Sequence, residues 1–262
     1  MRPRPATTPA PQLRLRDGGS ARLSRTPALA GAGVTAVALA GFAGLVDGVS
    51  EHADLASYDP GITSSVAGLR LPGLTFAAEV VSTVGSEVAI GLLTVGALAW
   101  LWFARRDRLR ALLFGAAMAG AAALTLGVKH LLGRHRPPAA FVVGPVDNGY
   151  SFPSGHTLFS TVFLGLVVML VVWPRGGRPA RVATVAAWVI GSVAIGASRV
   201  YLGYHWTTDV IAGWVLAVAV LGMALVALVA VLPRLEASRP WRVLAGRAND
   251  DMEGATDAGP AR

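Results

Sequence analysis

The chain has 262 residues, of which 53% are hydrophobic and only 15% charged, and its mean hydropathy is +0.55. This composition excludes an ordinary soluble domain and is typical of an integral membrane protein. The net charge of +8 does not indicate a nucleic-acid partner, because membrane proteins carry excess arginine in their cytoplasmic loops. No cysteine is present, so disulfides and thiolate metal sites are excluded.

The N-terminal region is basic and then apolar. Residues 1–26 are rich in proline and contain six arginines without apolar periodicity, which predicts a disordered cytoplasmic arm. Residues 27–46 form an apolar segment of about 20 residues, enough to cross the hydrocarbon core. A cleaved signal peptide ending near Ala38-Leu39-Ala40 is the alternative. We favour a retained helix.

Residues 47–83 have mixed character. Four acids occur between positions 47 and 59, Pro60-Gly61 then breaks the segment, and apolar residues follow. One or two short helices along the outer interface would fit this pattern, and an ordinary loop fits it equally well.

Five further apolar segments are long enough to span the membrane, at about 84–103, 111–132, 156–173, 182–200 and 208–232. The sequence therefore predicts an all-α polytopic membrane protein, with six transmembrane helices in one domain over residues 27–233. Residues 234–262 carry both charge signs and are expected to form a disordered cytoplasmic tail. Small residues dominate 111–132, so we expect this span at the centre of the bundle.

The basic residues support one orientation. With the N-terminus in the cytoplasm, the inner segments hold six, four, three and five arginines. The outer segments hold only five basic residues, which are Arg70, Lys129, Arg134, Arg136 and Arg199. This asymmetry follows the positive-inside rule and places both termini in the cytoplasm. Four of the five exceptions lie in or beside the motifs described next.

The first motif lies at the outer end of the third span. Lys129 and Arg136 are seven positions apart, and Pro137 follows. Seven residues make about two helical turns, so both side chains point the same way if the helix continues to Pro137.

The second motif, Pro153-Ser154-Gly155-His156, opens the fourth span. A glycine-containing turn that leads into a helix presents backbone N–H groups and the positive end of the helix dipole. Both features suit a phosphate group.

The third motif runs from Ser198 to Asp209 between two apolar spans and contains Arg199 and His205. Polar side chains are costly at this depth unless they have a function. His205 and Asp209 are four apart, so on a helix the carboxylate can hold the imidazole. A histidine oriented by an acid and placed beside an arginine suggests attack on a phosphate.

Together, Lys-x6-Arg-Pro, Pro-Ser-Gly-His and Ser-Arg-x5-His-x3-Asp, in this order, resemble the type-2 phosphatidic acid phosphatase superfamily. This superfamily also includes bacterial acid phosphatases and vanadium haloperoxidases. The resemblance covers roughly residues 47–232, its diagnostic part is 129–209, and no motif position departs from the family pattern. It implies an integral-membrane lipid phosphatase that works through a phosphohistidine intermediate, without metal or other cofactor.

The resemblance also assigns roles to individual residues. It makes His205 the nucleophile, Asp209 the partner of its other ring nitrogen, and His156 the general acid and then base. The residues expected to bind the phosphate oxygens are Lys129, Arg136, Arg199, Ser154 and Gly155. Three cations and helix-end amides would compensate the charge on the transferred group.

Polar residues next to the motifs receive simpler interpretations. We interpret His130 and His135 as interfacial residues without a catalytic role, and Asp147 as a loop residue. Arg134 could assist substrate binding, and contact with an anionic lipid is at least as good an explanation.

Aromatic residues cluster in the third motif. Tyr201, Tyr204 and Trp206 are interpreted most simply as an aromatic belt at the outer interface, with a secondary role at an acyl-chain entrance. Lys129 could snorkel from a helix end, but as the only lysine and the partner of Arg136 it is expected to bind phosphate.

The expected substrate is a membrane lipid with a phosphate or diphosphate head group at the outer face. Isoprenyl diphosphates, phosphatidic acid and phosphatidylglycerol phosphate are the candidates. A lipid phosphotransferase using the same site is one alternative, and a non-catalytic lipid-binding or transport protein is another. A haloperoxidase fits less well, because oxidising a halide requires no membrane spans. No feature of the sequence specifies an oligomer.

Overall fold

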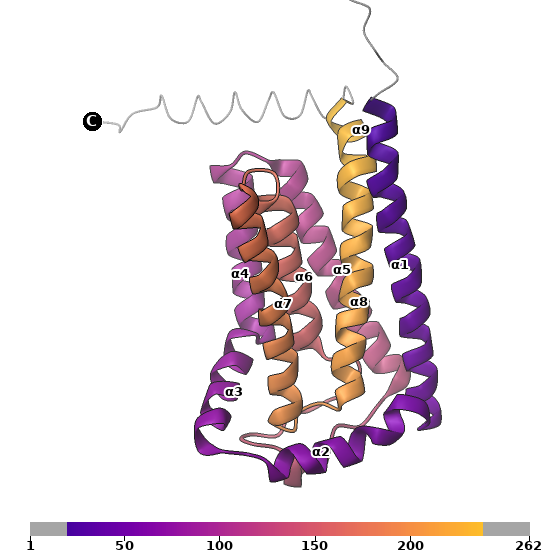
Figure 1. Ribbon diagram of the computed structural model, residues 1–262, viewed down its shortest axis with the longest axis vertical. Helices are drawn as coiled ribbons and strands as arrows, with labels where there is room; N and C mark the ends of the chain where they lie inside the picture. Colours follow the sequence, from indigo (N-terminus) through magenta and orange to yellow (C-terminus); the bar gives the residue numbers. More distant parts are fainter. Residues whose placement is uncertain (1–19, 238–262) are drawn as a thin grey trace, which may run out of the picture.

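A computed structural model describes residues 20–237, and within this range the chain is α-helical without β-strands (Figure 1). Six of its helices are long and apolar enough to cross a membrane, at Thr26–Glu51, Glu87–Ala104, Arg108–Leu132, Gly155–Val172, Arg178–Tyr201 and Thr207–Ala237. The prediction of an all-α, multi-pass membrane protein is confirmed. The predicted terminal arm and tail lie mostly outside the described residues, although residues 20–26 already form the start of α1.

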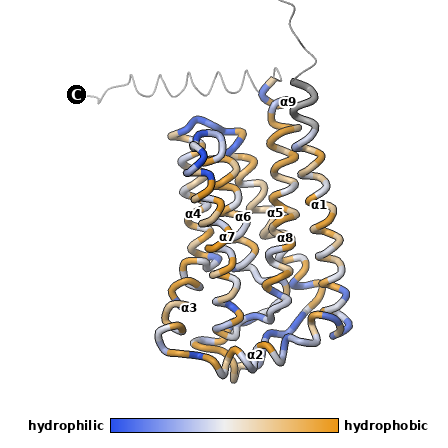
Figure 2. Tube along the Cα trace, in the orientation of Figure 1, coloured by the Kyte–Doolittle hydropathy of each residue, from blue (hydrophilic) through white to orange (hydrophobic). Residues whose placement is uncertain are grey.

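The spans correspond to these helices. They are α1 (Ser20–Glu51), α4 (Glu87–Ala99), α5 (Arg108–Leu132), α6 (Gly155–Leu166), α7 (Arg178–Tyr201) and α8 (Thr207–Val226), which is followed by the short α9 (Leu232–Ala237). Helices α4, α6 and α8 continue in π-helical turns at Trp100–Ala104, Val167–Val172 and Ala227–Val231. In Figure 2 hydrophobic residues dominate the length of the bundle, and hydrophilic residues gather at its two ends.

The segment between the first two spans is helical. α1 continues to Glu51, and a 3₁₀ helix (Asp54–Tyr58), α2 (Asp59–Gly68) and α3 (Pro72–Val84) follow. Short helices were therefore the correct alternative for this segment, and the loop was wrong. Pro60 does not break the segment, because it occupies the first turn of α2, where its missing N–H has no partner to lose. In Figure 1 α2 and α3 lie across one end of the bundle.

The centre of the bundle is α6 and not α5. Helix α6 packs against α4, α5, α7 and α8, and nine of its residues are buried. Helix α5 leaves Leu126 and Leu131 exposed, by 58% and 85%. Some small residues of α5 misled the prediction because they do not mark a close helix contact. A Cβ added at Gly120 or Gly127 would meet no described atom within 4 Å.

Four helix ends meet at the end of the bundle that α2 and α3 border. They are the C-terminal ends of α5 and α7 and the N-terminal ends of α6 and α8 (Figure 1). Because successive spans run in opposite directions, all three sequence motifs arrive at this one end of the molecule. We call it the motif end.

The turn between α7 and α8 depends on a glycine. Gly203 has φ +81°, and its N–H donates to the carbonyl oxygen of Val200 at 3.0 Å. A Cβ at this position would collide with the carbonyl group of Phe141. That carbonyl oxygen is held in place, since it accepts a hydrogen bond of 2.6 Å from Nη2 of Arg70. The turn therefore requires a residue that tolerates positive φ and has no side chain.

Replacing Gly203 by alanine should destabilise the fold by about 1–3 kcal/mol, because the new side chain adds backbone strain and a backbone clash. The midpoint of thermal unfolding in detergent measures this change. Gly91→Ala is the matched control, since Gly91 lies within α4 facing open space, and alanine there improves helix propensity. Equal midpoints for Gly203→Ala and the wild type would contradict the requirement.

Candidate functional site

His205 and Asp209 are in direct contact at the start of α8. Nδ1 of His205 lies 3.2 Å from Oδ2 of Asp209, and both residues are buried. The predicted contact is present, but the reason given for it was wrong. His205 precedes α8, which begins at Thr207, so the two do not share a helical face. Asp209 instead reaches back over the helix start, and the same oxygen accepts the N–H of Trp206 at 3.0 Å.

Arg136 contacts the other nitrogen of the same imidazole. Its Nη1 lies 3.3 Å from Nε2 of His205 and donates to the carbonyl oxygen of Tyr204 at 2.8 Å. Helix α5 ends at Leu132, as the predicted span did, and Gly133 caps it in the left-handed conformation. The helix does not continue to Pro137, so Lys129 and Arg136 do not share a helical face.

Lys129 belongs to the last turn of α5. Its Nζ donates to the carbonyl oxygen of Tyr150 at 2.6 Å, in the loop that leads to α6. Lys129 and Arg136 therefore both lie at the motif end, but Lys129 extends from helix α5 and Arg136 from the loop that follows its C-cap.

Arg199, in the last turn of α7, is 4% exposed. Its Nη1 donates to Oγ of Ser82 on α3 at 2.8 Å, and its guanidinium lies over the ring of Tyr204, 4.0 Å from the centroid. Nε of Arg199 is buried and has no hydrogen-bond partner among residues 20–237. A buried donor without an acceptor is costly, so this arginine is suited to receive an anionic oxygen.

Asp147 lies between the two arginines. Its Oδ2 is 2.7 Å from Nη2 of Arg199 and 3.6 Å from Nη1 of Arg136. The carboxylate is 42% exposed, whereas the two arginine side chains are 5% and 15% exposed. Asp147 lies in a loop, as expected, but it also contacts both arginines, which the sequence did not indicate. Its carboxylate occupies a position where the two arginines hold an anion.

The second motif forms the start of α6, as predicted. Ser154 is the N-cap residue and Gly155 the first residue of the helix. Ser154 is fully buried, its Oγ accepts from Thr157 at 3.0 Å, and its N–H donates to the carbonyl oxygen of Asp209. The imidazole of His156 is partly exposed and has no hydrogen-bond partner in the described part of the chain. It lies within electrostatic range of Arg199 and His205.

Burial keeps the imidazole of His205 neutral. Loss of hydration lowers its pKa well below the usual value of 6.5, and the positive charges of Arg136, Arg199 and Lys129 lower it further. With Asp209 at Nδ1, the proton resides on Nδ1, and the lone pair of Nε2 points towards the cations. The site therefore combines a neutral imidazole nitrogen with a group of cations that could hold an anion.

The residues next to the motifs have partners that their simpler interpretations did not include. Arg134 pairs with Asp59 at 2.7 Å and with Asp209 at 2.5 Å. The three aromatic residues interpreted as a belt each make a specific hydrogen bond. These bonds join the Tyr204 hydroxyl to the Val143 carbonyl, Trp206 Nε1 to the His135 carbonyl, and the Tyr201 hydroxyl to Leu71 N–H.

Three residues of the site were missed or dismissed at the sequence level. Asp59 and Ser82 hold Arg134 and Arg199 from α2 and α3, and Asp147 holds Arg199 from the loop before α6. No local pattern separates Asp59 from the other acids of its segment, because its partners lie 75 and 149 residues away. The few basic residues in the segments predicted to be outer, which depart from the positive-inside pattern, were the signal that acids should be found near them.

The part of the chain that contains the three motifs matches a known family model. The PAP2 superfamily model matches residues 110–232. An undecaprenyl-diphosphatase of Sulfolobus acidocaldarius is 35% identical over 95 residues, covering 34% of this chain and 40% of that protein. Phosphatidylglycerophosphatase B of Escherichia coli is 33% identical over 78 residues, covering 30% of this chain and 29% of that protein. The chain thus matches less than half the length of these relatives.

A solved structure shares the fold. The crystal structure of a transmembrane PAP2-type phosphatidylglycerolphosphate phosphatase from Bacillus subtilis superposes with a TM-score of 0.64 at 23% identity. The match covers 72% of this chain and 93% of that one. It supports the arrangement of the helices described above.

Removing the carboxylate of Asp147 should strengthen the binding of phosphate to the two arginines. In Asp147→Asn the two arginines lose the carboxylate that competes with phosphate for them. Because this carboxylate is partly exposed, we expect the free energy of phosphate binding to improve by only about 1 kcal/mol, which is roughly fivefold tighter binding of inorganic phosphate. Isothermal titration calorimetry of the purified protein measures this, with the exposed Asp47→Asn as control for a general charge effect. Unchanged or weaker binding would mean that Asp147 does not compete with the anion.

Proposed function

We propose that this chain, which matches the PAP2 superfamily model over residues 110–232, hydrolyses a lipid phosphate or diphosphate through a phosphohistidine. The observation that carries the proposal is the placement of the His205 imidazole. Asp209 contacts one of its nitrogens and Arg136 faces the other. A neutral nucleophile with one cation at its reactive atom is what attack on a phosphate anion requires.

In the first step, the lone pair of Nε2 of His205 attacks phosphorus, and the bond from phosphorus to the leaving oxygen breaks. The imidazole becomes positively charged, and Asp209 stabilises that charge through Nδ1–H. His156 donates a proton to the leaving oxygen. It is suited to this role because its ring is partly exposed and has no competing partner among the described residues.

In the second step, His156 removes a proton from water, and the water oxygen attacks the phosphohistidine. The bond between Nε2 and phosphorus breaks, inorganic phosphate leaves, and His205 returns to its neutral form. One residue thus acts first as an acid and then as a base.

The negative charge of the transferred group is met by fixed cations. Arg136 and Arg199 already bind the Asp147 carboxylate, and Lys129 lies within electrostatic range of His205. The first turn of α6 adds backbone N–H groups from Gly155 onward. The proposed chemistry relies on these cations to compensate the charge of the transferred group.

A hydrocarbon tail on the substrate fits the surroundings of the site. An apolar cavity of about 610 Å³ lies between α2, α3, α7 and α8, lined among others by Leu74, Val81 and Trp214. Ser198 and Val200, which flank Arg199 in the chain, also line this cavity. A lipid could therefore place its head group at the arginines while its chain stays among apolar side chains. Isoprenyl diphosphates, phosphatidic acid and phosphatidylglycerol phosphate share this chemistry.

The motif end is proposed to face away from the cytoplasm, with both termini on the cytoplasmic side. The arginine asymmetry supports this orientation, since the turns at the opposite end contain Arg105, Arg106 and Arg108 between α4 and α5 and Arg175 and Arg178 before α7.

Phosphate release from farnesyl diphosphate, phosphatidic acid and phosphatidylglycerol phosphate in mixed micelles tests the proposed activity. His205→Ala should abolish turnover, because no other nucleophile contacts Asp209 and Arg136, leaving roughly 10⁻³ of the wild-type rate or less. His130→Ala is the matched control, since this exposed histidine packs edge-to-face against Tyr150 at the same end of the bundle and should keep full activity.

Equal release by the wild type and His205→Ala would exclude catalysis by this imidazole. No release by the wild type from any of the three substrates would favour the non-catalytic alternative, a lipid-binding or transport protein.

A further inference from the structure

Asp59 is a buried acid outside the three motifs. It opens α2, is 1% exposed, and accepts the N–H of Thr208 in α8 at 3.1 Å. Its second oxygen accepts from Nη2 of Arg134 at 2.7 Å and from the hydroxyl of Thr208. A helix that lies across the motif end is therefore joined to the first turn of α8, the turn that carries Asp209.

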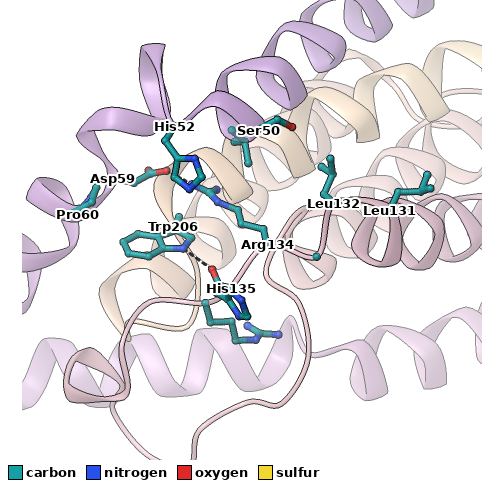
Figure 3. Close-up of a pocket in the computed structure, with 13 residues that line it drawn as sticks. Ser50, His52, Asp59, Pro60, Leu131, Leu132, Arg134, His135 and Trp206 are labelled. Carbon is teal, nitrogen blue, oxygen red and sulfur yellow. Dashed lines mark hydrogen bonds and ion pairs between the residues drawn. The ribbon is translucent and has the colours of Figure 1, made fainter.

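Arg134 connects Asp59 to Asp209. Its Nη1 donates to Oδ1 of Asp209 at 2.5 Å and to the hydroxyl oxygen of Thr208 at 2.8 Å, while its Nη2 donates to Oδ2 of Asp59. The guanidinium also lies over the Trp206 ring, 5.7 Å from its centroid. Figure 3 shows Arg134, Asp59 and Trp206 together beside a cavity of about 500 Å³. A planar, forked cation is suited to hold two carboxylates in fixed positions.

The charges alternate along this chain of contacts, from Asp59 to Arg134 to Asp209, and end at His205. A buried arginine beside Asp209 would by itself oppose the positive charge that His205 acquires on attack. Asp59 compensates that arginine, so Asp209 keeps its full effect on the imidazole. The same contacts leave Asp209 no other orientation, since His205 and Trp206 occupy its second oxygen.

We propose that Asp59 and Arg134 form a positioning pair that holds Asp209, and through it His205, in the orientation for attack. Neither residue touches the substrate. The role rests on the proposed phosphatase activity and adds to it a connection from the outer helix α2 to the nucleophile.

Two substitutions separate positioning from folding. Asp59→Asn keeps the size of the side chain and an oxygen for the Thr208 N–H, but it turns a donor amide towards Arg134. Arg134→Lys keeps the positive charge but cannot donate to both acids in the plane of a guanidinium. Both variants should reduce kcat by roughly 10- to 100-fold with KM changed by less than about twofold, because only the alignment of His205 is lost.

The assay uses full-length protein in detergent and the best substrate among farnesyl diphosphate, phosphatidic acid and phosphatidylglycerol phosphate. The amount of folded protein is measured for every variant by gel filtration and thermal unfolding, so that kcat refers to folded molecules. Asp54→Asn is the matched control, because Asp54 lies in the same segment but is exposed, and its kcat should be unchanged.

The double variant Asp59→Asn/Arg134→Lys tests whether the pair acts as one unit. Its kcat should be no lower than that of the more impaired single variant, because either change already releases Asp209. A double variant whose loss of kcat equals the product of the two single losses would overturn the proposal. A wild-type kcat for folded Asp59→Asn, or a rise in KM without a fall in kcat, would also overturn it. If Asp59→Asn does not fold, a wild-type kcat for Arg134→Lys would overturn it. An inactive wild type would instead refute the phosphatase activity itself.

Discussion

Asp209 lies at the first turn of α8 without exposed surface, and the motif end is built around its carboxylate. A buried carboxylate is stable only if its charge and lone pairs are satisfied. Here His205 and the N–H of Trp206 bind one oxygen and Arg134 binds the other, while its own carbonyl accepts the N–H of Ser154 at the start of α6. The acid thus links α6, α8 and the loop after α5 in the same contacts that orient the imidazole.

The helices outside the bundle complete this arrangement. Helix α2 supplies Asp59, which compensates Arg134, and helix α3 supplies Ser82, which holds one arm of Arg199. Each of these two arginines therefore has one partner from the segment between the first and second spans and another partner elsewhere at the motif end. The segment between the first and second spans therefore contributes side chains to the polar contacts at the motif end and does not only connect the two spans.

Much of this could be predicted from the sequence, because the signals are local. Span lengths follow from apolar runs, and the start of α6 follows from Ser154-Gly155. The contact between His205 and Asp209 was also predicted, but from helical spacing, whereas it forms across a helix N-terminus. The central position of α6 was missed because composition reports small side chains and does not report which face meets a neighbour. Asp59, Ser82 and Asp147 were out of reach, since each contact joins residues at least 52 positions apart.

A structure of the protein with bound orthovanadate would show directly whether His205 is the nucleophile, because vanadate adopts the geometry of a phosphate under attack. We expect vanadium bonded to Nε2 of His205, with its oxygens held by Arg136 and Arg199 and facing the first turn of α6. We also expect Asp147 to be displaced from the arginines. Vanadate bound elsewhere on the molecule, or bound at the motif end without contact to His205, would contradict this assignment of the nucleophile.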